Sequence, residues 1–307
     1  MKMKRFNHLM VASCLIVTLL ISGCSPDAID PEQHRAEIES WREYRARGLS
    51  APDGWLTLIG LSWLSEGENR CGSDPANPIL LPVDRAPGRL GTFVLRNEEV
   101  RFTASKGATV TSDGAPVSSL ILQDDNHDEG PTVLQHGSLS LYVIKRGDER
   151  AVRIKDTLSA TRLNFRGLSF FPIDLKWRVE ATYHPFPEPK VLDIPALTGP
   201  PQRFTFPGSL RFALDGAEYS LDAATEEGME DKLFLMFGDE TNGIETYGAG
   251  RQLYTNLPDE RNRVILDFNR AYNWPCVFTE FSTCPLPPVA NLLKLRVEAG
   301  EQVPADH

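Results

Sequence analysis

The chain has 307 residues and a formal net charge of −10, with 32 Lys and Arg residues against 42 Asp and Glu residues. So acidic a chain has no electrostatic reason to bind a nucleic acid or an anionic membrane surface, and we expect no nucleic-acid partner. The length is sufficient for a large hydrophobic core and predicts two domains.

The first 23 residues resemble a bacterial signal peptide. Three basic residues near the start precede an apolar segment at residues 9–21, which is too short to cross a bilayer as a mature helix. The sequence Ile-Ser-Gly-Cys at residues 21–24 resembles a lipobox, in which Cys24 becomes the lipidated N-terminus and carries acyl chains such as palmitate. The alternative is an ordinary signal peptide followed by a chance cysteine.

Processing at Cys24 would leave 284 residues, with 29 basic residues against 42 acidic ones and a net charge of −13. No later segment has 18 consecutive apolar residues, so the lipid anchor is the only membrane contact that we predict. Ser25 stands directly after the lipobox in place of an Asp, which resembles the bacterial sorting signal for the outer membrane. We therefore expect a lipoprotein of the cell envelope, facing the periplasm if the organism has an outer membrane.

Residues 24–50 are predicted to contain the anchor and a short helix at residues 30–48. Asp30 is a good N-cap, Pro31 suits the first helical position, and Gly48 is typical of a helix end. Trp41 lies on the apolar stripe of this helix. Trp41 could be a ligand platform, and we favour the alternative that it docks the helix onto the domain.

Residues 51–157 change to short strand patterns separated by turn residues, which predicts a β-sandwich. The predicted strands are residues 55–64, 91–95, 100–104, 108–112, 117–122 and 139–145. The segment GSDPANPILL at residues 72–81 is similar to the start of a forkhead-associated (FHA) sandwich. The Arg, Ser and His set with which such domains hold phosphothreonine does not line up, so we expect a related fold without phosphopeptide binding.

An acidic segment at residues 124–130, DDNHDEG, places oxygen ligands at alternate positions and suggests calcium. It departs from the EF-hand pattern at Glu129, where a Gly is needed, and no Glu closes a twelve-residue loop. A solvated acidic turn is the interpretation that we favour.

Residues 158–303 are predicted to form a second β-rich domain. Aromatic and basic residues are interleaved at its start. The Pro-rich segment 185–201 is predicted to connect strands along an edge. The Asp215-Gly216 pair predicts a hairpin turn. Strand patterns at residues 233–237, 244–247, 252–255 and 264–268 suggest a meander. Such a meander would bring the turn at residues 239–242, the segment 247–251 and the loop 267–273 together.

The loop that follows is the most distinctive part of the chain. Residues 266–288 read LDFNRAYNWPCVFTEFSTCPLPP, a composition too polar for a core and too rich in Pro for a flexible linker. Together with ETYGAGR at residues 245–251 and GENRCGSDP at residues 67–75, this stretch resembles the domain-of-unknown-function family 1684 from about Trp41 to Glu301. That resemblance implies no established activity. The chain departs from the family pattern at Trp274, where a second Pro is usual, and at Cys71, where an aromatic residue is usual.

Cys276 and Cys284 have seven residues between them. Outside the cytoplasm this spacing predicts a disulfide, and closing so small a loop is worth about 2.5 kcal/mol. A thiolate nucleophile or a zinc pair is the alternative, although no histidine or further cysteine stands nearby. Cys71 is then predicted to be buried and free.

The sequence has no G-x-S-x-G, H-E-x-x-H, P-loop or G-x-G-x-x-G motif, and its histidines are scattered, so we expect no metal and no cofactor. The predicted ligand-binding candidates lie on one C-terminal face: Asp239, Glu245, Tyr247, Arg251, Asp267, Asn269, Arg270, Tyr272 and Asn273.

Two functions are compatible with this face. The first is a binding module for a small polar or cell-wall-derived ligand. The second is a hydrolase-like enzyme that uses Asp239, Glu245 or Asp267 with Arg251 or Arg270 as an electrostatic partner. The same residues also suit a purely structural network.

Overall fold

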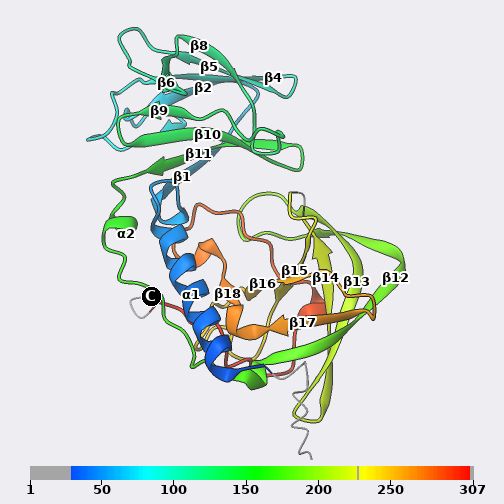
Figure 1. The fold of residues 1–307 in the computed structure, drawn as a ribbon. Helices are drawn as coiled ribbons and strands as arrows, with labels where there is room; N and C mark the ends of the chain where they lie inside the picture. The colour runs from blue at the N-terminus through cyan, green and yellow to red at the C-terminus, as the bar shows by residue number, and fades with distance from the viewer. Residues whose placement is uncertain (1–28, 227, 305–307) are drawn as a thin grey trace, which may run out of the picture.

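The computed structural model describes residues 29–226 and 228–304. The predicted signal peptide and Cys24 lie outside these ranges. The predicted all-β fold class is confirmed, with three sheets and one long N-terminal helix (Figure 1). In the two described ranges, we find no helix whose length and apolar character would let it cross a membrane.

The helix α1 spans Pro31–Ser50 and runs alongside the C-terminal sheet (Figure 1). The Asp30 side chain caps it by accepting a hydrogen bond from the Glu32 backbone N–H at 3.0 Å, as its sequence predicted. The helix continues two residues beyond the predicted end at Gly48. Trp41 packs against the rings of Phe170 and Tyr272, so α1 docks on the C-terminal domain.

Two sheets form the N-terminal sandwich between residues 58 and 156. The six-stranded sheet has the order β1 (Leu58–Trp63), β11 (Glu149–Asp156), β10 (Leu139–Arg146), β9 (Leu134–His136), β6 (Thr111–Ser112) and β7 (Ala115–Pro116). The five-stranded sheet has the order β3 (Ile79–Leu80), β2 (Gly67–Gly72), β4 (Gly91–Arg96), β5 (Glu99–Ala104) and β8 (Ser119–Leu122). Their facing side chains form one core, in which the Phe93 and Phe102 ring centroids lie 4.9 Å apart.

The strand β11 is in the interior of its sheet, although it was not among the predicted strands. Val152 and Ile154 point into the sandwich core. Because side chains alternate along a strand, Arg153 between them lies on the opposite face, in register with Leu61 of β1 and Tyr142 of β10. This outer face turns toward the C-terminal domain.

The short helices η1 (Trp55–Thr57), α2 (Ala160–Leu163) and η2 (Leu175–Trp177) precede or follow the sandwich. The C-terminal sheet then has the order β17 (Arg263–Asp267), β12 (Arg178–Ile194), β13 (Gln202–Leu214), β14 (Ala217–Thr225), β15 (Lys232–Phe237), β16 (Arg251–Asn256) and β18 (Tyr272–Asn273). It curls until β17 approaches β16, where Thr255 Oγ1 donates to the Ile265 carbonyl at 2.7 Å. The sheet encloses a core built around Phe237 and Phe268.

The predicted turn at Asp215-Gly216 joins β13 and β14, with φ angles of 51° and 80° that suit a tight hairpin. The predicted edge connection at residues 185–201 is corrected. β12 continues to Ile194, because its pairing with β13 is interrupted only between Pro185 and Lys190 and then resumes. Pro187 and Pro189 fall in this interruption, where no ladder N–H is needed.

The predicted meander is also corrected. Residues 244–247 form a turn, β16 pairs with β15 and β18, and β17 pairs with β12. The closing part of the chain adds the short helices η3 (Phe268–Arg270), η4 (Pro275–Val277) and η5 (Val289–Asn291).

The two domains meet along the outer face of the six-stranded sheet. A Cβ added at Gly199 would lie 2.3 Å from Cζ2 of Trp63, so a residue with a side chain cannot replace this glycine without a shift. Thr279 Oγ1 donates to the Leu58 carbonyl at 3.2 Å, and Arg146 Nε donates to Thr283 Oγ1 at 3.2 Å. The distinctive loop after β18 is therefore held between the domains.

Candidate functional site

Asp239 and Arg251 form a buried ion pair. Both side chains are 0% exposed, and Arg251 Nη2 lies 2.8 Å from Asp239 Oδ2. Nη2 also donates to the Val297 carbonyl at 2.8 Å, and Nη1 donates to that of Ala299. Burial lowers the pKa of Arg251, and the neighbouring Asp239 opposes this effect. The pair holds the C-terminal segment to β16 and presents no charge to solvent.

Asn273 is buried beside this pair and links three segments. Its Oδ1 accepts from the Tyr247 backbone N–H at 3.2 Å, and its Nδ2 donates to the Gln302 carbonyl at 2.9 Å. Glu245 lies at the surface, where its Oε1 is 2.5 Å from Nη2 of Arg296.

Asp267, Asn269 and Arg270 serve the docking of α1. Asp267 Oδ2 lies 2.7 Å from Nε2 of the buried His34, and Arg270 is 3.8 Å from Glu37. Asn269 donates through Nδ2 to the Asp174 carbonyl at 2.9 Å. These side chains face the helix and the chain before β12.

The nine predicted residues thus form no single exposed face, which corrects that expectation. Four of them, Asp239, Arg251, Asn269 and Asn273, have buried side chains. The physical reason is the strand order, because β17 is paired with β12 and carries the 267–270 segment under α1. The carboxylates of the hydrolase alternative, Asp239, Glu245 and Asp267, are each held by a different basic partner.

Tyr272 lies elsewhere, in a pocket of about 290 Å³ between the two domains, which we call the interdomain pocket. It is lined by Arg45, Trp55, Arg146, Arg153, Gln202, Phe204, Glu226, Phe234, Gln252, Tyr254, Tyr272, Trp274, Pro275, Ser282, Thr283, Cys284 and Pro285. The sandwich, α1 and the C-terminal domain all contribute. This mixture of aromatic walls and a few polar groups is typical of small-ligand sites, which prefer domain interfaces.

Two polar groups of this pocket lack hydrogen-bond partners among the residues that the structure describes. Arg153 is 4% exposed, and its Nε and Nη2 atoms make no hydrogen bond within residues 29–226 and 228–304. Trp274 is 7% exposed, and its indole N–H likewise has no acceptor in the described part of the chain. Buried donors without acceptors are costly, so each is available to a ligand.

Two tyrosines complete the pocket as protonated hydroxyl groups. Burial raises the pKa of Tyr254, and the hydrogen bond that its hydroxyl donates to Glu226 raises it further. Burial also raises the pKa of Tyr272, whose ring lies 4.4 Å below the Arg45 guanidinium. Neither hydroxyl is suited to act as a base at neutral pH.

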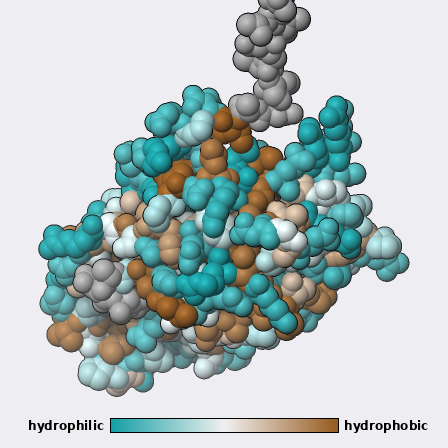
Figure 2. All heavy atoms as spheres, turned by 90° about the horizontal axis from the view of Figure 1, so that it is seen from below, coloured by the Kyte–Doolittle hydropathy of each residue, from teal (hydrophilic) through white to brown (hydrophobic). Residues whose placement is uncertain are grey.

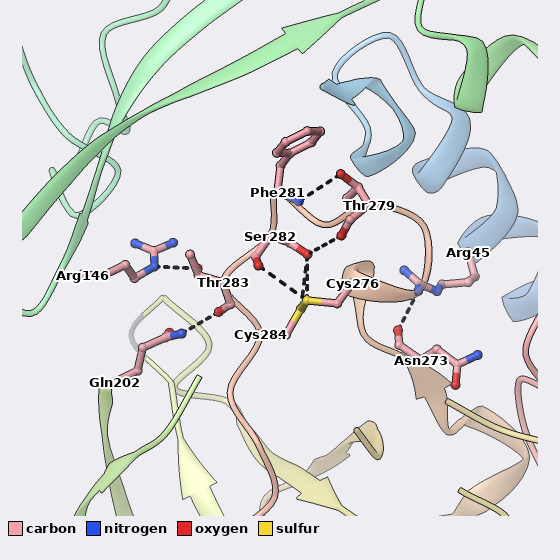
Figure 3. Close-up of a disulfide and its surroundings, with 10 residues drawn as sticks. All are labelled: Arg45, Arg146, Gln202, Asn273, Cys276, Thr279, Phe281, Ser282, Thr283 and Cys284. Atoms are coloured by element: carbon pink, nitrogen blue, oxygen red, sulfur yellow. Dashed lines mark hydrogen bonds between the residues drawn. A yellow bond between two sulfur atoms is a disulfide. The ribbon is translucent and has the colours of Figure 1, made fainter. Parts of the chain in front are cut away.

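The predicted disulfide between Cys276 and Cys284 is confirmed, and Cys71 is the free cysteine in the described ranges, where it is buried as predicted. The disulfide closes the loop that forms one wall of the interdomain pocket. Figure 3 shows Arg146 and Gln202 reaching toward Thr283 of this loop from two sides. Both domains therefore fix the loop that the disulfide closes.

A wider cleft of about 1230 Å³ adjoins the pocket and shares Arg146, Gln202 and Glu226 with it. The acidic segment 124–130 contributes to this cleft, and Asp125 accepts from the Lys145 backbone N–H at 2.9 Å and from Arg146 Nη1 at 3.1 Å. Within the described ranges, no three His, Cys, Asp or Glu side chains are grouped closely enough to hold a metal ion.

One end of the molecule can be compared with the pocket. Figure 2 shows the end of the molecule seen from below, where hydrophobic residues are dispersed in small groups among hydrophilic ones. The interdomain pocket instead gathers six aromatic rings and an unpaired guanidinium.

Sequence reasoning found Tyr272 and Cys284 of this pocket and missed Trp55, Arg153 and Tyr254. Arg153 stands between Val152 and Ile154, so the alternation of apolar and polar side chains along the strand would by itself place it on the outer face of the sheet. A charged residue on such a face is usually solvated. Nothing in the local pattern indicates that a second domain covers it.

Residues 163–302 match the model of a protein family described as "Protein of unknown function (DUF1684)". A solution NMR structure of an uncharacterized protein from Haloarcula marismortui is 34% identical, with the alignment covering 48% of this chain and 81% of that one at a TM-score of 0.38. None of the curated proteins compared with the chain matches it.

Two FHA-domain structures also align. One comes from a study of phosphothreonine-dependent FHA domain interactions and is 17% identical, covering 32% of this chain and 95% of that one at a TM-score of 0.22. The other is the FHA domain of FhaA, which is 16% identical and covers 30% of this chain and 96% of that one at a TM-score of 0.22.

Proposed function

Because this chain belongs to the DUF1684 family, as its motifs predicted, and the family description assigns no function, we propose a function from the interdomain pocket. The protein is a lipoprotein of the cell envelope that binds a small polar ligand between its two domains. The unpaired donors of Arg153 and Trp274, buried among aromatic rings, carry this proposal.

The rings supply the contact surface for a ligand. The Phe234 centroid lies 4.9 Å from that of Tyr254 and 5.9 Å from that of Trp274, with the second pair close to perpendicular at 87°. These rings already pack against one another in a buried cluster, which makes this wall of the pocket rigid. The disulfide and the contacts of Arg146 with Thr283 keep the opposite wall in place, as a preorganised site requires.

The binding test uses the mature chain with Cys24 replaced by Ser, so that it is free of lipid. Cell-wall fragments and simple sugars are titrated by isothermal calorimetry and by ligand-observed NMR. Trp274→Phe keeps the ring and removes the indole donor, and it should weaken binding at least fivefold. Trp177→Phe is the matched control, because Trp177 lies in the C-terminal core away from the pocket. Equal weakening by both variants would contradict the assignment of the pocket.

The envelope location is tested separately in cells. Labelling with an alkyne analogue of palmitate should mark the wild type and not Cys24→Ala, and the label should follow the membrane fraction. Equal labelling of both proteins would exclude lipidation at this cysteine and leave the binding proposal untouched.

A further inference from the structure

We propose that the ligand of the interdomain pocket is a ring-sized monocarboxylic acid whose carboxylate pairs with Arg153. This inference rests on the proposed function and names the ligand class of the same site. Three guanidinium groups line the pocket, and they differ in what already neutralises them.

Two of the three have carboxylate partners within the protein. Arg45 Nε lies 3.2 Å from Glu301 Oε2, and Arg146 Nη2 lies 2.9 Å from Asp125 Oδ2. Arg153 makes no ion pair with any acidic residue of the described ranges, although it is almost fully buried. It is therefore the guanidinium whose charge a ligand can neutralise.

Aromatic rings stabilise Arg153 only in part. Its guanidinium carbon lies 5.1 Å from the Trp55 centroid and 5.9 Å from the Tyr142 centroid. Such contacts act on the charge through the ring faces. They supply no acceptor for the N–H groups, whose desolvation cost remains. A carboxylate meets both needs, because its two oxygens match two parallel N–H donors of a guanidinium.

The charge around the pocket selects a monoanion. Glu226 lines the same pocket, and the adjoining cleft adds Asp148, Glu149 and Asp193 among its acidic residues. A phosphate monoester carries a charge of about −1.5 to −2 at neutral pH. Arg153 is the one guanidinium of the pocket without an ion pair in residues 29–226 and 228–304, so a phosphate monoester would keep excess negative charge beside these carboxylates. A carboxylate brings a single charge and is neutralised by Arg153 alone.

The size and walls of the pocket define the rest of the ligand. A volume of about 290 Å³ lies at the lower end of small-ligand sites, so one ring with short substituents fits. Phe234, Tyr254 and Trp274 line the pocket with aromatic surface. Both an aromatic ring and the apolar face of a sugar ring can pack there. The unpaired Trp274 indole N–H adds one donor for a hydroxyl or carbonyl oxygen of the ligand.

The test compares acids with matched neutral molecules on the lipid-free mature chain. N-acetylmuramic acid is paired with N-acetylglucosamine, glucuronic acid with methyl glucoside, and phenylacetic acid with phenylacetamide. We expect at least one acid to bind tenfold or more tightly than its neutral partner. The pair that shows the preference distinguishes a sugar acid from an aromatic acid.

Arg153→Met should abolish the preference for an acid over its neutral partner. Arg101→Met is the control, because Arg101 lies on the exposed face of β5 in the same domain. Thermal melting checks that each variant is folded. If Arg153→Met does not fold, the affinities of the wild type for an acid and its neutral partner still show whether the pocket prefers a carboxylate. Equal affinity for acids and neutral partners, or a preference that survives Arg153→Met, would overturn the inference and keep the pocket as a site. Absence of binding by every acid and every neutral molecule would overturn the proposed function with it.

Discussion

Replacing Asp239 with Asn would leave the Arg251 guanidinium buried without its counter-ion. Both side chains are 0% exposed, so solvent cannot compensate for the lost charge. The new amide can still accept the hydrogen bonds that Asp239 Oδ1 receives from the Thr241 and Val297 backbone N–H groups at 2.9 and 3.2 Å. The amide nitrogen takes the place of Oδ2, so Arg251 Nη2 loses its acceptor at 2.8 Å together with the counter-charge. Breaking one partner of a buried pair costs about 3–5 kcal/mol.

In a domain of this size, 1 kcal/mol shifts the melting temperature by roughly 2–4 °C, so Asp239→Asn should lower it by about 6–20 °C. Differential scanning calorimetry measures this shift. The double variant Asp239→Leu with Arg251→Met removes both charges and should melt above the single variant, because neither charge is then left unpaired. A shift below 2 °C for Asp239→Asn, or a double variant that melts lower still, would refute this account of the pair.

Three further predictions concern other buried groups. Burial raises the pKa of Glu301 above its ordinary value of 4.5, against the opposing effect of Arg45, so the folded state binds this proton more tightly than the unfolded state. Glu301 contributes its full stabilisation at pH values below its pKa in the unfolded state. This stabilisation is lost as the pH rises through its pKa in the folded state. The melting temperature of Glu301→Gln should therefore rise relative to that of the wild type as the pH increases above 4.5. A difference in melting temperature that does not change with pH would contradict the raised pKa. Burial raises the pKa of the Cys71 thiol to about 12. Iodoacetamide at pH 8 should therefore modify Cys71 only after unfolding, and rapid labelling of the native protein would contradict its burial. Peptide mapping without reductant should recover Cys276 linked to Cys284, and changing both to Ser should lower the free energy of unfolding by about 2.5 kcal/mol in urea titrations. An unchanged unfolding midpoint would show that closing the loop adds no stability.

A site between two domains also has a consequence for how the protein responds to its ligand. Arg153 belongs to the sandwich, and Tyr254 and Trp274 belong to the C-terminal domain. The proposed ligand would contact both sets, so its binding would favour the apposed domains. Under this proposal its affinity would also depend on the interdomain contacts of Trp63 and Thr279.

Local sequence signals identified the features of this chain that depend on neighbouring residues. The Asp30 cap and Pro31 marked the start of α1, the Asp215-Gly216 pair marked a hairpin, and the spacing of Cys276 and Cys284 indicated a disulfide. Each of these follows from backbone geometry or chain entropy over a few residues.

The candidate site was different, because its residues come together only through long-range pairing. Asp239, Arg251 and Asp267 were polar residues in a distinctive stretch, and the fold uses them in a buried pair and under α1. A sequence pattern gives the alternation of faces along a strand and does not say what covers each face. Arg153 on β11 would read as a solvated residue, and only the packing of the second domain over that sheet makes it a buried and unpaired cation.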